Sequence, residues 1–169
     1  MWGMIATWRM ALEGIQKVTP NLEAGGTAGD AIEGAIKEVE DFPYFKSVGY
    51  GGLPNEEMEV ELDAAYLDGS TFDFGAVCAL KQFANPISVA RALSAYKVNN
   101  VLVGEGAAAF AKAHHFEEKD MLTDRAKIHF HNRLKDIERE QLTPYAGHDT
   151  VGMVGLDASG DMVAGTSTS

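Results

Sequence analysis

The chain has 169 residues, 46% of them hydrophobic, and a formal net charge of -11 at pH 7. This length and composition predict one soluble domain that is large enough to bury an ordinary core. The excess of acidic side chains argues against nucleic acid or an anionic membrane surface as a partner, because both need clustered cations.

Two features of the sequence bear on its compartment. Cys78 is the only cysteine, so it cannot form an internal disulfide, and its surroundings (GAVCAL) predict a buried apolar thiol. The first residues (MWGMIATW) lack the basic segment and long apolar core of a secretory signal, and no stretch approaches the ~20 apolar residues of a transmembrane helix. We expect a cytoplasmic protein.

The first half of the chain alternates strand and helix patterns. The segment Gly3 to Thr7 predicts a strand, and Met10 to Val18 predicts a helix ended by Pro20. Thr27 and Asp30 have a spacing like that of a helix capping box. The helix that Thr27 begins has one apolar face, formed by Ala31, Ile32, Ala35, Ile36 and Val39.

A glycine-rich loop and a hairpin come next. The segment SVGYGGLPNEE, from Ser47 onward, has the glycines and proline of a loop. The strand patterns Met58 to Leu67 and Thr71 to Leu80 are separated by the turn DGS. We therefore predict a β-hairpin.

The second half begins with a helix that Asn85 is expected to cap, with Pro86 at its first position. Its apolar stripe contains Ile87, Ala90, Leu93 and Tyr96. Further predicted elements are a strand (Val101 to Val103), a helix (Ala107 to His114), a longer helix (Thr123 to Glu140), the linker Gln141 to Gly147 and two strands joined by DASGD. The longer helix is expected to turn Ala126, Phe130, Leu134 and Ile137 inward, and the linker to be the most mobile internal segment.

Two other patterns have ordinary interpretations. The segment VLVGEGAAAF has the strand, glycine turn and helix of a nucleotide-binding site, but the acidic residue expected about 20 residues later falls in a helical stretch. We expect Gly104 and Gly106 to form a simple turn. The pairs His114–His115 and His129–His131 would point their rings to different faces, so we predict no metal site.

The triplet His148-Asp149-Thr150 stands directly before a strand pattern. A threonine hydroxyl inside a chain is a poor nucleophile, but a threonine at the start of a free chain has its own α-amine as a base near neutral pH. Cleavage before Thr150, by attack of its hydroxyl on the Asp149 carbonyl, would therefore create a catalyst. Asp149 could assist proton transfer and His148 could position that carboxylate. The triplet alone also fits a polar loop before a hairpin.

The segment GHDTVGMVGLDASGDMVAGTSTS resembles the processing site of the glycosylasparaginases, which belong to the N-terminal nucleophile (Ntn) hydrolases. Further similar segments occur in the same order along the chain: ATW, SVGYGG, LDAAYLDG, NPISVAR and VLVGEGA. The HDT and NPISVAR segments favour this branch over the plant-type asparaginases and isoaspartyl peptidases. The resemblance covers nearly the whole chain.

The resemblance implies a role for individual residues. Thr150 matches the nucleophile of both self-cleavage and hydrolysis, and Thr168 matches a second threonine whose hydroxyl contacts it. Asp149 matches the residue that promotes processing, with His148 in support. Trp8 matches the tryptophan that lines the pocket for the asparagine part of the substrate, and the glycine loop has a structural role.

The implied substrate is a small molecule, an asparagine whose side-chain amide carries N-acetylglucosamine, as in glycoprotein degradation. The implied fold is an α/β (α+β) four-layer αββα sandwich, assembled as a homodimer of αβ units without a cofactor. Residues 1–149 would be the α subunit, and residues 150–169 would begin the β subunit of a single Ntn-hydrolase domain.

The chain stops at TSTS, where the family continues into a segment resembling HGRVGDS, which holds the substrate's charged groups, and later a TG that builds the oxyanion hole. We therefore expect only the amino-terminal part of the domain, inactive by itself. Two alternatives remain: an L-asparaginase or isoaspartyl peptidase of the same superfamily, and a noncatalytic truncated remnant.

Overall fold

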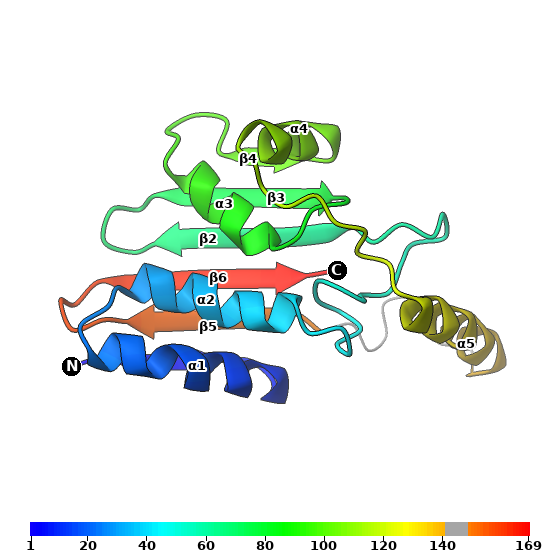
Figure 1. Ribbon diagram of the computed structural model, residues 1–169, viewed down its shortest axis with the longest axis horizontal. Helices are drawn as coiled ribbons and strands as arrows, with labels where there is room; N and C mark the ends of the chain where they lie inside the picture. Colours follow the sequence, from blue (N-terminus) through cyan, green and yellow to red (C-terminus); the bar gives the residue numbers. More distant parts are fainter. Residues whose placement is uncertain (141–148) are drawn as a thin grey trace.

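The structure is a computed structural model that describes residues 1–140 and 149–169. Within these residues the chain forms one six-stranded sheet and five α-helices (Figure 1). The strands are β1 (Gly3–Ala6), β2 (Leu62–Asp68), β3 (Phe74–Leu80), β4 (Val101–Val103), β5 (Val151–Leu156) and β6 (Met162–Thr168). The helices are α1 (Leu12–Glu23), α2 (Ala28–Glu40), α3 (Pro86–Ser94), α4 (Glu105–Ala113) and α5 (Asp124–Glu140), with a 3-10 turn, η1 (Arg9–Ala11), before α1.

The sheet has the order β1-β5-β6-β2-β3-β4, and only the β3–β4 pair is parallel. The two predicted hairpins, β2–β3 and β5–β6, lie side by side because β2 pairs with β6. Strand β1 pairs with β5, so that Ala6 lies opposite Met153. The residues that follow β1 therefore meet the residues that precede β5.

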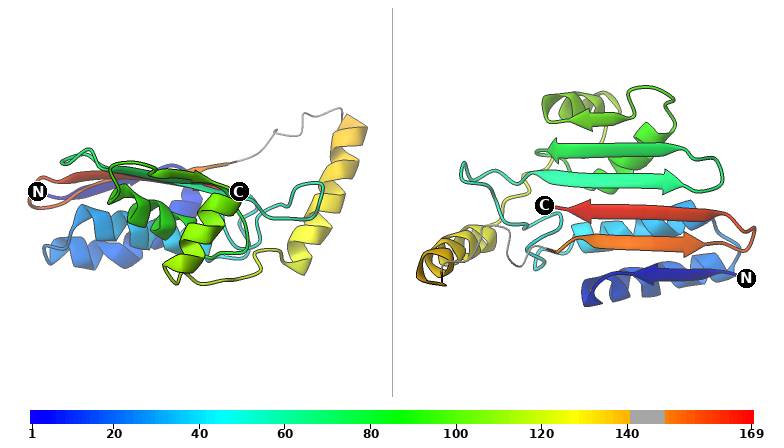
Figure 2. Two further views of the ribbon diagram at one scale, coloured as in Figure 1. Left: turned by 90° about the horizontal axis from the view of Figure 1, so that it is seen from above. Right: turned by 180° about the vertical axis from the view of Figure 1, so that it is seen from behind.

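Helices α1 to α4 all lie on one face of the sheet, whereas α5 is set apart beyond one end of it (Figure 2). The apolar side chains between this face and the helices form the core. The following core residues are almost completely buried: Ile32, Ile36, Leu62, Val77, Leu80, Ile87, Leu93, Val151 and Met153.

The opposite face of the sheet has no helix over it in the described part of the chain (Figure 2). A row of directly paired residues crosses this open face: Ile5, Val154, Ala164, Leu67 and Phe74. All of them except Ala164 are exposed apolar side chains. Cys78, expected to be buried, is only half-buried because it faces this side, opposite to its buried neighbour Val77.

Helix α2 begins as predicted, with the Thr27 hydroxyl accepting a hydrogen bond from the Asp30 N–H at 3.1 Å. Asp157, in the β5–β6 turn, adds a second cap by accepting from the Ala28 N–H at 2.9 Å. All five residues of the predicted apolar face are buried.

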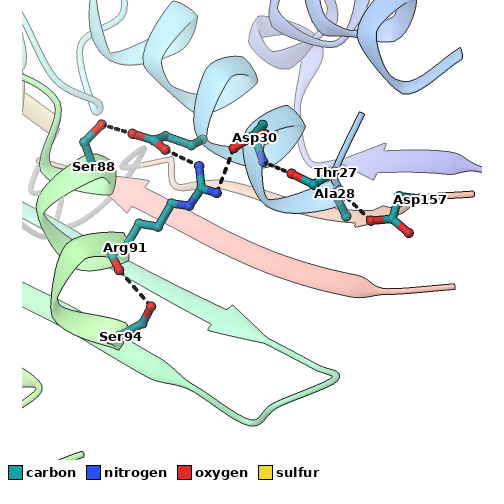
Figure 3. Close-up of polar contacts among 8 residues, drawn as sticks. Thr27, Ala28, Asp30, Ser88, Arg91, Ser94 and Asp157 are labelled. Atoms are coloured by element: carbon teal, nitrogen blue, oxygen red, sulfur yellow. Dashed lines mark hydrogen bonds and ion pairs between the residues drawn. The ribbon is translucent and has the colours of Figure 1, made fainter. Parts of the chain in front are cut away.

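Polar side chains on the outer side of α2 tie it to α3 (Figure 3). Arg91 of α3 donates to Glu33 at 2.5 Å and to Asp30 at 2.8 Å, and Ser88 donates to Glu33. The guanidinium also lies over the ring of Tyr66, 5.6 Å from its centroid. These contacts fix α3 relative to α2 above the middle of the sheet.

Helix α1 does not end at Pro20 as predicted, but continues to Glu23 with Pro20 inside it. A proline removes a single helical hydrogen bond. Continuation buries the Leu22 side chain completely, which offsets that loss.

The predicted cap of α3 is also wrong. Asn85 has a left-handed backbone (φ 48°), and its amide donates to Asp41 at 3.0 Å rather than capping its own helix. The carboxyl group of Glu40 takes that place, accepting from the Ile87 N–H at 3.1 Å. A residue from α2 therefore caps α3. Tyr96, placed on the apolar stripe of this helix, is exposed.

Two predictions for the segments beside the sheet have different outcomes. The inward face expected for α5 is wrong, because only Ala126 of its four apolar positions is buried and Leu134 is 45% exposed. The linker Gln141 to Gly147 lies outside the described residues, so its predicted mobility stays a prediction.

The mixed α/β class is confirmed, whereas the four-layer arrangement is not seen in this chain. One sheet and one layer of helices are present within residues 1–140 and 149–169. Among these residues, no helix has both the length and the apolar composition needed to cross a membrane.

Candidate active site

Asp149 and Thr150 lie directly before β5, at the end of the sheet where β6 finishes (Figure 1). Asp149 is half-buried and Thr150 is exposed. The third member of the triplet, His148, lies outside the described residues, so its supporting role stays a prediction.

Thr7, which follows β1, contacts the residues on both sides of Val151. Its hydroxyl donates to the Thr150 carbonyl at 3.0 Å and accepts from the Gly152 N–H at 2.8 Å. Its backbone N–H also donates to the Gly152 carbonyl at 2.9 Å. The side chain thus continues the β1–β5 ladder by one step and holds the carbonyl side of Thr150.

Thr168, the last residue of β6, lies on the other side of the predicted scissile bond. Its hydroxyl is 3.2 Å from the Ser47 carbonyl and 3.5 Å from the Asp149 carbonyl oxygen. The longer distance is at the limit of a hydrogen bond. The structure therefore brings Thr168 to the Asp149 side of the Asp149–Thr150 bond, and its predicted contact with the Thr150 hydroxyl stays a prediction.

The glycine loop from Ser47 to Gly52 supports the end of β6. The Ser47 carbonyl accepts from the Ser169 N–H at 2.8 Å as well as from Thr168. Gly49 has φ 64°, and a Cβ atom there would lie 2.2 Å from the Glu40 carbonyl oxygen. Only glycine fits this conformation and this approach, so the loop is held tightly against the end of α2.

Trp8 follows Thr7, the residue that contacts Thr150, directly in the chain. Its backbone has φ 63°, which is unusual for a bulky residue, and 61% of its surface is exposed. Its predicted contact with substrate stays a prediction. Strained backbone of this kind is often found at functional sites.

Glu40 is a fully buried acidic residue close to this site. Burial raises the pKa of its carboxyl to about 8, although the Ser167 hydroxyl, the Ile87 N–H and the Asn85 amide act in the opposite direction. Sequence analysis missed Glu40 and Thr7. The sequence signal for Glu40 was an acidic residue directly after the apolar face of a helix. The signal for Thr7 was its place inside the ATW segment.

The other candidate sites have ordinary surroundings. Gly104 forms the turn between β4 and α4 and donates its N–H to the Cys78 carbonyl, whereas Gly106, predicted to lie in the same turn, is already within α4. His114 and His131 each place Nδ1 within 3 Å of a carbonyl of their own helix. Among residues 1–140 and 149–169, no three His, Cys, Asp or Glu side chains are grouped to hold a metal ion.

This geometry suits an acyl shift at one peptide bond. The hydroxyl of Thr150 is adjacent to the carbonyl that it would attack, and the contacts of Thr7 and Thr168 restrain the two sides of that bond. Holding reacting groups in place in this way lowers the entropic part of a barrier.

Comparison with known proteins identifies the family. The family model described as asparaginase (Asparaginase_2) matches residues 6–169. The chain belongs to this family of Ntn hydrolases. The match includes every site residue discussed above.

Several relatives are similar over most of the chain. An N(4)-(β-N-acetylglucosaminyl)-L-asparaginase of Elizabethkingia miricola is 36% identical over 98% of this chain and 48% of its own length. An isoaspartyl peptidase/L-asparaginase of Rattus norvegicus is 34% identical over 92% and 49%, respectively. A plant-type L-asparaginase of Thermococcus kodakarensis is 39% identical over 85% and 50%.

Two facts follow from these comparisons. The chain spans about half the length of these relatives. Overall identity does not separate the glycosylasparaginases from the other asparaginases, because the values lie within a few per cent of one another.

Proposed function

We propose that this chain is the self-cleaving half of an amidohydrolase that uses Thr150 as its nucleophile. The observation that carries the proposal is the position of the Asp149–Thr150 bond, between the Thr7 hydroxyl and the Thr168 hydroxyl at the end of the sheet. Family membership supports the same chemistry.

Self-cleavage would proceed in two steps. The Thr150 hydroxyl attacks the Asp149 carbonyl carbon, the C–N bond breaks, and the nitrogen takes a proton to become the free α-amine. Water then hydrolyses the resulting ester and leaves Asp149 as a new carboxyl terminus. Asp149 assists the proton transfer and His148 supports it.

Hydrolysis of the substrate would repeat this chemistry with the new amine as the base. The hydroxyl of Thr150 attacks the side-chain amide carbonyl of N4-(β-N-acetylglucosaminyl)-L-asparagine, and the leaving nitrogen departs as the protonated glycosylamine. Water then releases aspartate from the acyl-threonine. Trp8 would line the pocket for the asparagine part.

The charge clamp for the substrate and the oxyanion hole would come from the second half that the relatives have. Loss of one oxyanion donor commonly costs ~10²–10³ in rate, so the chain by itself is expected to be inactive. We propose that the complete protein is a cytoplasmic homodimer of αβ units in a four-layer sandwich.

The test requires an extended protein. In this extended protein, the 169 residues are followed by the sequence encoded downstream of Ser169 in the same gene. If the reading frame ends at Ser169, they are instead fused to the second half of the Elizabethkingia miricola relative. Aspartate release from glycosylasparagine is expected after cleavage, and none from a Thr150→Ala variant. Normal activity in Thr150→Ala would overturn the proposal.

An L-asparaginase or isoaspartyl peptidase is the second candidate, because relatives with those names have an identity to this chain within a few per cent of that of the glycosylasparaginase relative. Aspartate release from glycosylasparagine, free asparagine and an isoaspartyl dipeptide, compared as kcat/KM in the extended protein, separates the two. A noncatalytic remnant would release aspartate from none of the three.

A further inference from the structure

Glu40 stands out among the buried groups, because nothing in the chemistry proposed for Thr150 uses it. It is the last residue of α2 and has no exposed surface. Ionised carboxylates are rarely buried without a charged partner, because burial removes their hydration. No ion pair of Glu40 occurs in the described part of the chain, so its position calls for another explanation.

The carboxyl of Glu40 connects three elements. One oxygen accepts from the Ile87 N–H in the first turn of α3 at 3.1 Å, and the other lies 3.4 Å from the Asn85 amide nitrogen. The hydroxyl of Ser167 in β6 is the third neighbour. This hydroxyl is buried and has no hydrogen-bond partner within the described residues.

The backbone of Glu40 holds the glycine loop. Its carbonyl accepts from the Tyr50 N–H at 2.7 Å, and Gly49 lies directly against it. The same loop contributes the Ser47 carbonyl, which contacts Thr168. Glu40 therefore has two neighbours that adjoin Thr168. One is Ser167, which precedes Thr168 in β6, and the other is the glycine loop.

We propose that Glu40 is a positioning residue for cleavage at the Asp149–Thr150 bond. Its carboxyl lies beside Ser167 near the end of β6 and its backbone carbonyl holds the glycine loop, so that the Thr168 hydroxyl stays against the Asp149 carbonyl. The proposal rests on the self-cleavage proposed above. It assigns Glu40 no contact with substrate.

The Glu40 carboxyl has its positioning role in the protonated, neutral form. With the pKa of Glu40 raised to about 8 by burial, most molecules carry a protonated carboxyl at pH 7. That carboxyl still accepts from the Ile87 N–H and can donate its own O–H to Ser167. A glutamine offers the same carbonyl and an N–H in place of the O–H, so it is expected to substitute well.

Asp157 supplies a matched control. It is also a buried acidic side chain that caps a helix, accepting from the Ala28 N–H at 2.9 Å (Figure 3). It lies at the opposite end of α2, in the turn of the β5–β6 hairpin. Its loss weakens α2 without touching the glycine loop or Thr168. An Asp157→Asn variant therefore separates a loss of stability from a loss of positioning.

The experiment measures the first-order rate of cleavage of the extended protein by intact mass, together with its unfolding in urea. Glu40→Ala is expected to cleave roughly 10- to 100-fold more slowly while folded, because small misplacements of reacting groups have effects of this size. Glu40→Gln is expected to restore the rate, and Asp157→Asn to lose stability but cleave normally.

Cleavage of folded Glu40→Ala at the unchanged rate would overturn the inference, as would an equal slowing in Asp157→Asn. If Glu40→Ala does not fold, the milder variant Ser167→Ala tests the inference instead. Slower cleavage of Ser167→Ala would support the positioning role of Glu40, and an unchanged rate would contradict it. Failure of the unsubstituted extended protein to cleave would instead overturn the proposed function, and this inference with it.

Discussion

Thr7 has the most direct side-chain contacts with the residue that we propose as the nucleophile. Its hydroxyl bridges the Thr150 carbonyl and the Gly152 N–H, and both contacts lie on the carboxyl side of the scissile bond. They therefore persist after cleavage, when Thr150 becomes a chain end that could fray. Thr7→Val keeps the shape and removes both bonds, so we expect cleavage and kcat in the extended protein to fall roughly 10-fold.

Thr7→Ser is the control for this prediction, because it keeps the hydroxyl and is expected to retain most of the cleavage rate. The kinetics of cleavage are followed by intact mass, and kcat and KM are measured on the cleaved product. A fall in kcat with little change in KM indicates positioning of the nucleophile. Equal rates for Thr7→Val and the unsubstituted protein would show that the contact has no role.

The raised pKa of Glu40 leads to a prediction of how the stability of the protein depends on pH. Its pKa is raised from 4.5 to about 8 in the folded protein, so between these values the unfolded chain has released a proton that the folded chain retains. The contribution of this group is fully present below pH 4.5 and is lost as pH rises toward 8. Glu40→Gln removes the titration.

We therefore expect the free energy of unfolding of the extended protein to fall between pH 5 and 8 by on the order of 1–3 kcal/mol more than that of Glu40→Gln. Urea unfolding at several pH values measures this difference. Parallel pH profiles for the two proteins would mean that Glu40 is ionised in the folded state.

At the scale of single residues, the sequence alone predicted only some of the candidate site residues. Threonine chemistry and family resemblance indicated Asp149, Thr150 and Thr168, and the structure brings these three together. Thr7 and Glu40 could not be found in this way, because their partners are far away in sequence and depend on the pairing of β1 with β5 and of α2 with α3.

The link between α2 and α3 gives a prediction at the scale of elements. The planar fork of Arg91 reaches Glu33 and Asp30 at once, and a lysine cannot bridge two carboxylates in the same way. Arg91→Lys is expected to lower the free energy of unfolding of the extended protein by about 1 kcal/mol.

The control for Arg91 is the pair formed by Arg9 and Glu13, which is exposed to solvent. Exposed pairs contribute little, so Arg9→Lys is expected to change stability by less than about 0.5 kcal/mol. Urea unfolding measures both variants. Equal effects would show that the α2–α3 link is no stronger than an ordinary surface pair.

Elements with local signals were predicted well. Thr27 marks the beginning of α2, and the turn residues DGS and DASGD mark the two hairpins. The errors arose where tertiary contacts prevail over local preference. Burial of Leu22 lets α1 continue past Pro20, and of the expected apolar face of α5 only Ala126 is buried among the described residues.

At the scale of the whole molecule, the open face of the sheet is the main feature that one sheet and one helical layer leave unexplained. The row from Ile5 through Val154 and Leu67 to Phe74 is apolar and exposed. Contiguous exposed apolar patches of this kind usually mark a binding surface. On the proposed four-layer fold, the second half covers it.

A double substitution, Ile5→Lys with Val154→Lys, tests this arrangement. In the extended protein it buries two charges between the sheets, so we expect loss of folding. In the 169-residue chain the same change is expected to reduce binding of a hydrophobic dye without a loss of secondary structure. A stably folded, cleaving extended variant would contradict the four-layer proposal.

The order of the strands could not have been predicted from periodicity alone. Hairpins follow from neighbouring segments, but β1 beside β5 and β2 beside β6 are pairings between distant segments. The resemblance to a family implied a four-layer sandwich, of which one sheet and one helical layer are present within the described residues. The register of that sheet puts Thr7, Asp149 and Thr168 at one of its ends.

The most direct test of the account is intact-mass spectrometry of the extended protein over time. We predict conversion of one chain into two, one ending at Asp149 and one beginning at Thr150, with activity appearing only as the second is formed. Thr150→Ala is expected to stay whole and inactive, Thr150→Ser to cleave in part because it keeps a hydroxyl, and Asp149→Ala to cleave slowly. A single chain that persists with full amidase activity would contradict the mechanism.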